Sequence, residues 1–476
     1  VGSLASGGSI TNSFAVSAVT GSGGSSTSVG VLAGTYGGSI TNSYYWSGAA
    51  CDADGATGGT QACNTISTGS QAAASSFYST TTQPLAVWDF QNETAVGLID
   101  EWASASLDYP TAWYVSPSNT GIPFFDGNGT TSDPYLVSSV ATYNLISSNP
   151  RWMSKSFKLT ANLSFATVAP KQIGSLQTPF YGTFEGNGKT LSNMNIGTPM
   201  QSFVGVFGAS LAPSQISNLT IASSTITASD HAGGLVGYTT GAISGVTFAG
   251  TMTVGSTSGG LVGLLSFPAT LSAGTVSALI DAGSSSSSVG GLVGSSTGVI
   301  TKSISASTLS GGTLSVGGLV GSLEGGTVTN SYTSGVYGFT SANRLGGLVG
   351  SMSGGAVVSN SYSAATVSNT TENSGGLVGY TAAGTSIVGS FAVGNTTGDT
   401  ATTLVGLLVG GHAGTMTTSW VLGTATCTPG TGTCNSISTG TAGAITDFYN
   451  SSNAPISSWD FTTIWKTDSV SLPTHR

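Results

Sequence analysis

Gly-Gly-Leu-Val-Gly at residues 233–237 is the stretch that decides the fold, because it returns along most of the chain. The same phrase stands at 259–263, 290–294, 317–321, 346–350 and 375–379, with looser copies at 204–208 and 406–410. From Gly208 to Gly410, the closing glycines are 29, 26, 31, 27, 29, 29 and 31 residues apart. A phrase that recurs at this period indicates an array of stacked repeats.

The residues between the copies favour β-strands over helices. They are mostly Ser, Thr, Gly and Val, as in Thr-Val-Thr-Asn-Ser-Tyr-Thr-Ser at 327–334. Helical repeats would need Ala, Leu, Glu and Lys at a 3.6-residue period. One repeat can instead form a coil of three short strands with a corner after each. We therefore predict an all-β fold, a parallel and right-handed β-helix solenoid with about 29 residues per coil and small capping segments.

Each phrase is expected to serve the interior of the solenoid. Its glycines would supply positive φ or a close backbone approach, and its valine would point outward or lie at a corner. A second phrase, Thr-Asn-Ser-Tyr at 329–332, returns at 41–44 and in a variant at 359–362, and is interpreted as another strand and corner. We predict that the leucines of the first phrase stack as an internal ladder formed by Leu235, Leu261, Leu292, Leu319, Leu348, Leu377 and Leu408.

Composition excludes several classes of partner. The 476 residues contain 9 Lys and Arg against 18 Asp and Glu, a formal charge of −9, so no basic patch is available for nucleic acid. Hydrophobic residues make up 39% of the chain and are periodic, which argues for a core rather than disorder. The sequence has no apolar run long enough for a transmembrane segment. Because Val1 opens inside a repeat, we expect a processed or truncated product.

The cysteines form two close pairs in the sequence, Cys51 with Cys63 and Cys427 with Cys434. Similar words follow each pair, Cys-Asn-Thr-Ile-Ser-Thr-Gly at 63–69 and Cys-Asn-Ser-Ile-Ser-Thr-Gly from Cys434 on. We predict two local disulfides in equivalent loops, which implies an oxidising, extracellular compartment. Neither pair has the spacing of a zinc knuckle.

A larger repeat lies above the small one. Cys63, Phe77 and Trp88 each return 371 residues later, in the same order. We therefore predict the tail of one unit followed by the whole of the next. The predicted domains are 1–111 (C-terminal part of one unit, with Cys loop and aromatic cover), 112–200 (N-terminal cap and first coils of the second), 201–425 (the repeat array) and 426–476 (Cys loop and C-terminal aromatic cover).

The motifs resemble those of a known family. Gly-Gly-Leu-Val-Gly is similar to the GLUG motif of bacterial secreted surface proteins, and the segment from Gly127 to Ile196 resembles the one that precedes such repeats. The chain departs from that pattern at Asn162, where the family usually has an acidic residue. The resemblance implies exported adhesins or surface fibres with β-helical stalks. It also implies a link to IgA-cleaving metallopeptidases that carry the repeats as an accessory.

Catalytic signatures are weak. A zinc peptidase needs His-Glu-x-x-His on one helix face, and none of His231, His412 and His475 has that setting. β-Helix enzymes that act on polysaccharides need clustered carboxylates, whereas the acidic residues of the array do not recur in register. We predict that the chain is not an enzyme and keep a polysaccharide-active enzyme as the less favoured alternative.

Two ligand-binding interpretations stay open. Asp52-x-Asp54-Gly55 and Asp126-Gly-Asn128-Gly129 loosely resemble calcium loops but lack the distal Glu, so no cofactor is predicted and calcium stays an alternative. Four aromatic residues could form a sugar-binding shelf, although covering a solenoid edge is the favoured reading. These candidate shelf residues are Tyr44, Tyr45, Trp46 and Trp420.

These patterns favour a structural function, which depends on the shape of the molecule rather than on catalysis. We predict a structural subunit or segment of a bacterial extracellular fibre or cell-surface adhesin. Its predicted partners are head-to-tail copies of itself or the continuation of a longer repeat array, because an uncovered coil would recruit other chains. The alternative is a monomeric adhesin stalk that binds glycans or a host surface.

Overall fold

The chain divides into two compact units, Val1–Phe124 and Phe125–Arg476. The boundary therefore lies after Phe124, beyond the predicted one at residue 111. The computed structural model describes residues 125–476, apart from gaps at 149, 284–285, 312–313, 340–341, 370–371, 399–403 and 430–433, and short stretches between Ser3 and Ala112.

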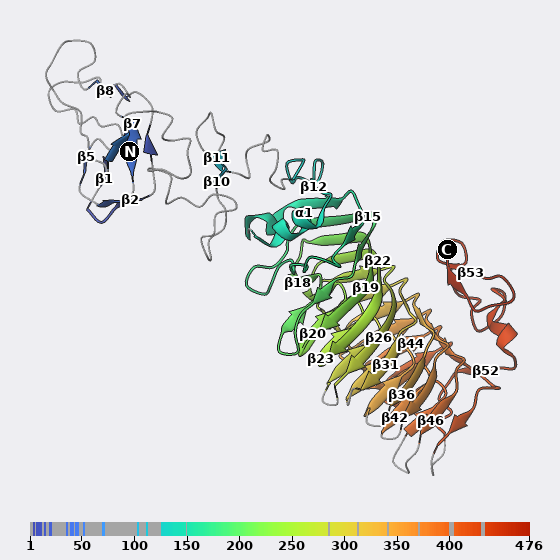
Figure 1. Cartoon of the computed structure of the whole chain (residues 1–476). Coiled ribbons are helices and arrows are strands. Elements are labelled where there is room, and N and C mark those ends of the chain that lie inside the picture. Colours follow the sequence, from blue (N-terminus) through green and yellow to red (C-terminus); the bar gives the residue numbers. More distant parts are fainter. Residues whose placement is uncertain are drawn as a thin grey trace. The chain divides into compact units, whose positions relative to one another are not determined.

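The second unit is a parallel β-solenoid, as predicted (Figure 1). Successive coils contribute strands to three sheets, and almost every pairing is parallel with a partner one coil away, as between β34 (Thr327–Thr329) and β39 (Val357–Ser359). Two sheets contain eight strands each, and the third contains 25. We call them the first short, second short and long sheets, in the order in which a coil passes through them.

The first short sheet contains β17 (Ser202–Val204), β20 (Asp230–Gly233), β23 (Ser256–Gly259), β27 (Ser288–Gly290), β32 (Ser315–Gly317), β37 (Arg344–Gly346), β42 (Asn373–Gly375) and β47 (Leu404–Gly406). The second short sheet contains β18 (Phe207–Ser210), β21 (Val236–Thr239), β24 (Val262–Leu265), β28 (Val293–Ser296), β33 (Val320–Glu324), β38 (Val349–Ser353), β43 (Val378–Thr381) and β48 (Val409–His412).

The long sheet begins with β12 (Tyr135–Val137), β13 (Ser156–Leu159), β14 (Leu163–Ser164), β15 (Thr183–Ser192), β16 (Asn195–Ile196), β19 (Gln215–Thr227), β22 (Ala242–Val254), β25 (Thr270–Ser272) and β26 (Thr275–Ala282). From the next coil on, each coil adds three short strands. These are β29 (Val299–Thr301), β30 (Ile304–Ser305), β31 (Thr308–Gly311), β34, β35 (Tyr332–Thr333), β36 (Val336–Phe339), β39, β40 (Tyr362–Ser363), β41 (Thr366–Asn369), β44 (Ser386–Val388), β45 (Phe391–Ala392), β46 (Thr396–Gly398), β49 (Thr415–Thr417), β50 (Trp420–Leu422), β51 (Cys427–Thr428) and, at the end, β52 (Gly440–Ala442).

The Gly-Gly-Leu-Val-Gly phrase forms the bend between the two short sheets, which we call the glycine seam. The leucines of the predicted ladder are all 0% exposed. The valine that follows each is also 0% exposed rather than outward-facing. The reason is the bend itself. The N–H groups of Leu261 and Val262 both donate to the carbonyl of Leu292 on the next coil (2.9 and 3.0 Å), so two adjacent side chains enter the interior.

The seam needs glycine for space rather than for its backbone angle. None of the glycines in the six full copies of the phrase has a positive φ. A Cβ on Gly318 would lie 2.1 Å from the carbonyl oxygen of Gly347 on the next coil, and one on Gly294 would lie 2.6 Å from the nitrogen of Ser258. Of the two expected roles for these glycines, close backbone approach is therefore the one that applies.

A cap covers the first coil. It contains α1 (Val140–Leu145), which Ser139 caps by accepting the N–H of Thr142, and the 3-10 turns η3 (Ile146–Ser148) and η4 (Pro150–Ser154). β12 pairs with β13, and β13 pairs with β15, so the long sheet continues into the cap. Its core is a cluster of aromatic rings from Phe125, Tyr135, Trp152, Phe157 and Phe180.

The first unit shows the same type of pairing where it is described. Parallel pairs join strands about one repeat apart, with Ile10 opposite Ile40 and Phe14 opposite Tyr44. Its strands are β1 (Ser3–Leu4), β2 (Ser9–Thr11), β3 (Phe14–Ala15), β4 (Val19–Thr20), β5 (Thr35–Tyr36), β6 (Ser39–Thr41), β7 (Tyr44–Trp46), β8 (Cys51–Asp52), β9 (Gly69–Gln71), and an antiparallel pair of β10 (Trp102–Ala103) and β11 (Thr111–Ala112).

Candidate functional site

The corner on the other side of the coils carries a column of left-handed residues. The first two members lie inside β19 and β22, and each later member directly follows the first strand that its coil adds to the long sheet. The strand registers place all of them above one another. Three of the eight members are asparagine and two are glycine. This corner column consists of Asn218, Gly245, Ala273, Lys302, Asn330, Asn360, Gly389 and Thr418, with φ from 45° to 61°.

A serine follows the corner column in the later coils and satisfies the backbone there. The Ser331 hydroxyl donates to the carbonyl of Thr329 (2.8 Å) and accepts the backbone N–H of Ser303 on the preceding coil (3.1 Å). The same two bonds recur at Ser361 and Ser390. These serines are buried, with 0% exposure. In the second phrase the serine therefore satisfies backbone groups at the corner, and the asparagine supplies the left-handed residue.

Aromatic rings stack directly after the serines. The rings of Tyr332 and Tyr362 lie 4.8 Å apart, and those of Tyr362 and Phe391 lie 4.9 Å apart, each pair within 2° of parallel. Trp420 continues this aromatic ladder, because it lies opposite Phe391 in the strand register.

The C-terminal segment folds back over the aromatic ladder. We call residues 444–476 the clasp. It contains η5 (Ile445–Phe448), β53 (Trp465–Lys466) and β54 (Thr474–His475), and its rings form one buried cluster with the ladder. Hydrogen bonds fix it to the corner column: the Trp459 indole donates to the Gly389 carbonyl (2.7 Å), and Nε2 of His475 lies 2.7 Å from the Asn330 carbonyl.

Burial under the clasp shifts two ionisations. Desolvation raises the pKa of Tyr362, whose hydroxyl donates to the Pro473 carbonyl (2.8 Å). Desolvation likewise lowers the pKa of His475, and the hydrogen bond that Nε2 donates to the Asn330 carbonyl opposes this shift only in part. Both shifts follow from docking the clasp, because each group would be hydrated without it.

The aromatic shelf residues fall into two groups. Trp420 is half-buried between Phe391 and Gly440 of β52, and packs against the clasp cluster. Tyr44 has the equivalent place in the first unit, between Phe14 and Gly69. For Tyr45 and Trp46 the structure describes only the backbone of β7, so their side chains lie outside it. In the second unit, Trp420 is therefore part of the packing between the last coils and the clasp.

A separate cap closes the last coil, and a disulfide between Cys427 and Cys434 ties it. The N–H of Asn435 donates to the Val405 carbonyl (2.6 Å) and its amide donates to the Gly410 carbonyl. Beneath this cap lies a cavity of about 220 Å³ with Leu408 and Val421 in its lining. The predicted pair Cys51 and Cys63 cannot be followed, because Cys63 lies outside the described residues.

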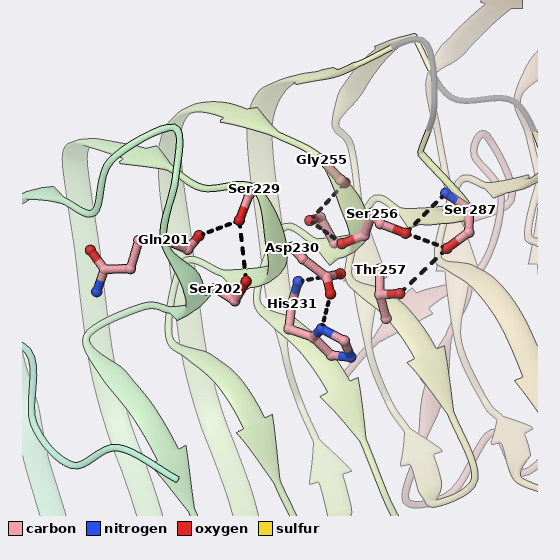
Figure 2. A network of polar contacts seen from close by, with 10 residues as sticks. Gln201, Ser202, Ser229, Asp230, His231, Gly255, Ser256, Thr257 and Ser287 are labelled. Atoms are coloured by element: carbon pink, nitrogen blue, oxygen red, sulfur yellow. Dashed lines mark hydrogen bonds and ion pairs between the residues drawn. The ribbon is translucent and has the colours of Figure 1, made fainter.

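A polar network runs along the start of the first short sheet (Figure 2). Nδ1 of His231 lies 2.6 Å from an Asp230 carboxylate oxygen, and its ring stacks on Phe203 at 4.6 Å. Hydroxyl pairs flank it, with 3.1 Å between Ser202 and Ser229. In Figure 2 the contacts drawn from His231 go to Asp230.

No metal centre is found in the described part of the chain, where no three His, Cys, Asp or Glu side chains converge. At the calcium-like loop, the side-chain oxygen Oδ1 of Asn128 accepts the N–H and hydroxyl of Thr130, so that loop is a turn closed by its own hydrogen bonds. The other loop includes Asp54, which lies outside the described residues. Among the helices that the structure describes, none is both apolar and long enough to cross a bilayer.

Comparison with known proteins gives partial likenesses. No protein-family model matches the chain. Halomucin of Haloquadratum walsbyi is 30% identical over 168 residues, which cover 33% of this chain and 2% of the length of Halomucin. A candidate immunoglobulin A1 protease of Bacteroides ovatus has 20% identity and a TM-score of 0.42, covering 74% of this chain and 94% of that one. A further IgA1 protease structure has 19% identity and a TM-score of 0.37, covering 56% of this chain and 21% of its own.

Proposed function

We propose that this chain is a non-catalytic structural segment of an extracellular fibre or cell-surface adhesin. The observation that carries the proposal is that the end of a solenoid occurs twice, with matching strand pairings. Phe14, Tyr44 and Gly69 pair in the first unit as Phe391, Trp420 and Gly440 do in the second. A unit that recurs within one chain supports a role in building length.

Both ends of the second unit are covered, and this bears on how successive units are joined. The N-terminal cap continues the long sheet over the first coil, and the cap at Asn435 closes the first short sheet after the last one. We therefore propose that units follow one another as separate beads of a longer chain, rather than as one continuous stack of coils. The match to Halomucin, of whose length the aligned part is 2%, supports a place in a long array.

The compartment proposed is the cell surface or the extracellular medium. The disulfide between Cys427 and Cys434 supports it, because such bonds persist in oxidising environments. The low content of charged residues, 6%, and the internally satisfied backbone suit a stiff, inert spacer. The similarity of the repeated phrase to the GLUG motif supports the same interpretation.

Negative-stain electron microscopy of the full chain, with and without reducing agent, tests the bead proposal. We expect each chain to form two separate solenoid bodies that do not join into filaments in either condition. Continuous filaments with a regular axial repeat would instead indicate subunits that assemble head to tail. Fractionation of the source cells tests the compartment, and recovery of the chain only from the cytoplasm would refute it.

A further inference from the structure

The surface of the second unit carries several Asn-x-Ser/Thr sequences, the acceptor motif for N-linked glycans. Two more, at Asn92 and Asn369, lie outside the described side chains. The motif alone does not select among them, because a chain rich in Ser and Thr produces it by chance. The described ones begin at Asn128, Asn162, Asn218, Asn395 and Asn450, and all five asparagine side chains are exposed.

Hydrogen bonding of the side-chain amide and of the surrounding backbone distinguishes these five asparagines from one another. Glycan transfer needs a free amide nitrogen, Nδ2, on a segment that can enter an enzyme's active site. Nδ2 of Asn218 donates to both carboxylate oxygens of Glu185 (3.1 and 3.2 Å), and the residue lies inside β19. The Nδ2 atom of Asn218 is therefore engaged and its backbone is held in the ladder.

Asn162 and Asn395 are also tied to the coils. Each uses its side-chain oxygen to accept a backbone N–H from the adjacent coil, from Thr190 (2.9 Å) and Thr426 (2.8 Å) respectively. A strand of the long sheet begins at the next residue in both cases. Their amides are open to solvent, but the motif around them cannot bend without breaking strand pairing.

Asn128 and Asn450 differ, because each forms a turn with its own motif outside the coils. The side-chain oxygen of Asn128 accepts the N–H of Thr130 (3.1 Å), and that of Asn450 accepts the N–H of Ser452 (3.0 Å). Within the described residues, no hydrogen bond engages Nδ2 of either one. Asn128 lies in the N-terminal cap and Asn450 in the clasp, so both can be approached without opening a coil.

We propose that Asn128 and Asn450 carry N-linked glycans and that Asn218 does not. The donor would be an oligosaccharide linked to a polyprenyl phosphate or diphosphate. Nδ2 forms a bond to the anomeric carbon and loses a proton to solvent or to the leaving group, while the bond from that carbon to the phosphate oxygen breaks and the lipid phosphate or diphosphate leaves. The proposal rests on the proposed export of the chain, because such transfer takes place on exported segments.

The two sites have a physical consequence for a bead. Each hydrated glycan would project from a segment that covers coils, next to the aromatic rings of the cap or of the clasp. With 27 charged residues among 476 (9 basic and 18 acidic), the chain has few other means of keeping such segments apart in solution. Glycans at these places would favour separate beads over sheet-to-sheet contact.

The test is glycopeptide mass spectrometry on the full chain recovered from its source cells, after separation of exported and cytoplasmic fractions. We expect glycan mass on the peptides of Asn128 and Asn450, and its loss in Asn128→Gln and Asn450→Gln. Thr130→Ser keeps the motif and should keep the glycan, whereas Thr130→Ala should lose it. Asn218→Gln is the matched control and should leave the glycan pattern unchanged.

Each result decides between the two proposals. Unmodified Asn128 and Asn450 peptides from exported chain would overturn the glycan proposal and leave the structural function intact. Glycan on Asn218 at the same occupancy would show that amide bonding does not select the site. Chain confined to the cytoplasm would overturn the proposed function, and unmodified peptides from it would overturn the glycan proposal as well.

Discussion

Along its coils, the second unit passes alternately through the glycine seam and the corner column. In the full copies of the phrase the seam glycines have ordinary negative φ, and their missing side chains make room for the next coil. In the corner column φ is positive at every member, yet six of the eight carry a side chain, and none of these six is buried. The two edges show that a glycine column does not by itself indicate a left-handed backbone.

The two edges are also stabilised differently. The seam is held by backbone bonds and by the buried Leu and Val of each copy, all from within the array. The later part of the corner column depends on a distant segment, since the clasp bonds Asn330 and Gly389 from residues 145 and 70 positions away. We therefore expect a substitution in the seam to destabilise the coils around it. A substitution in the clasp should instead release the clasp and leave the seam protected.

Removing a clasp ring should give the largest effect. Trp465 is 0% exposed and packs against Tyr362 and Trp459, so Trp465→Ala should cost the clasp about 3–5 kcal/mol. Hydrogen exchange of peptides from residues 444–476 measures it, together with peptides that cover the seam. If peptides of the seam lose protection to the same extent, the clasp and the seam do not unfold independently.

Adding a single methyl group at the glycine seam should give the second-largest effect. Gly318→Ala places a Cβ 2.1 Å from the Gly347 oxygen and 2.6 Å from the Tyr337 ring, and should destabilise the surrounding coils by about 3 kcal/mol. Gly355→Ala is the matched control, since its φ is +81° and no atom lies within 4 Å of the added Cβ. The control should cost about 1 kcal/mol. If thermal melts show the same loss of stability for both variants, the space available to the added Cβ does not determine the cost.

Opening the disulfide should have an intermediate effect confined to the last coil. Cys427 and Cys434 are 7 residues apart, and closing so short a loop contributes about 2–3 kcal/mol in the chain-entropy treatment. The Cys427→Ser, Cys434→Ser double variant should expose peptides around Asn435 and Val421 to exchange. Protection near Leu235 should not change, and a loss there would indicate that the cap stabilises the whole array.

Much of the coil architecture could be predicted from the sequence, because repetition multiplies a weak signal. The spacing of Leu261, Leu292 and Leu319 predicts an internal ladder, and all three side chains are 0% exposed. The valine next to each lies at the bend, which is one of its two predicted places, and its side chain is buried because the sharp bend turns two adjacent side chains inward. An aromatic cover was predicted at the C-terminus, but the partners on which Trp459 and His475 dock could not be predicted, because contacts between residues so far apart leave no periodic trace.

A pH effect should distinguish the clasp from the seam. The pKa of His475 lies below its ordinary 6.5, mainly through desolvation, so the unfolded chain binds a proton before the docked clasp does. Clasp stability should therefore be full above about pH 6.5 and fall as the pH decreases below it. His475→Gln should flatten this dependence in hydrogen exchange of the clasp. His412→Gln is the control, because burial also lowers the pKa of His412 but His412 lies in β48.

Replacing a left-handed non-glycine residue by glycine should give the smallest effect, and it should stabilise the protein rather than destabilise it. Ala273 lies in the corner column with a φ of 52°, and its side chain is a single methyl group. Ala273→Gly removes a strain of about 1–2 kcal/mol and adds unfolded-chain entropy worth about 0.5–1 kcal/mol, so a gain of about 0.5 kcal/mol is expected. Ala249→Gly, in β22 with ordinary φ, should lose about 0.5–1 kcal/mol instead. If chemical denaturation gives both variants the same sign, backbone angle is not what distinguishes the corner column from the rest of the coil.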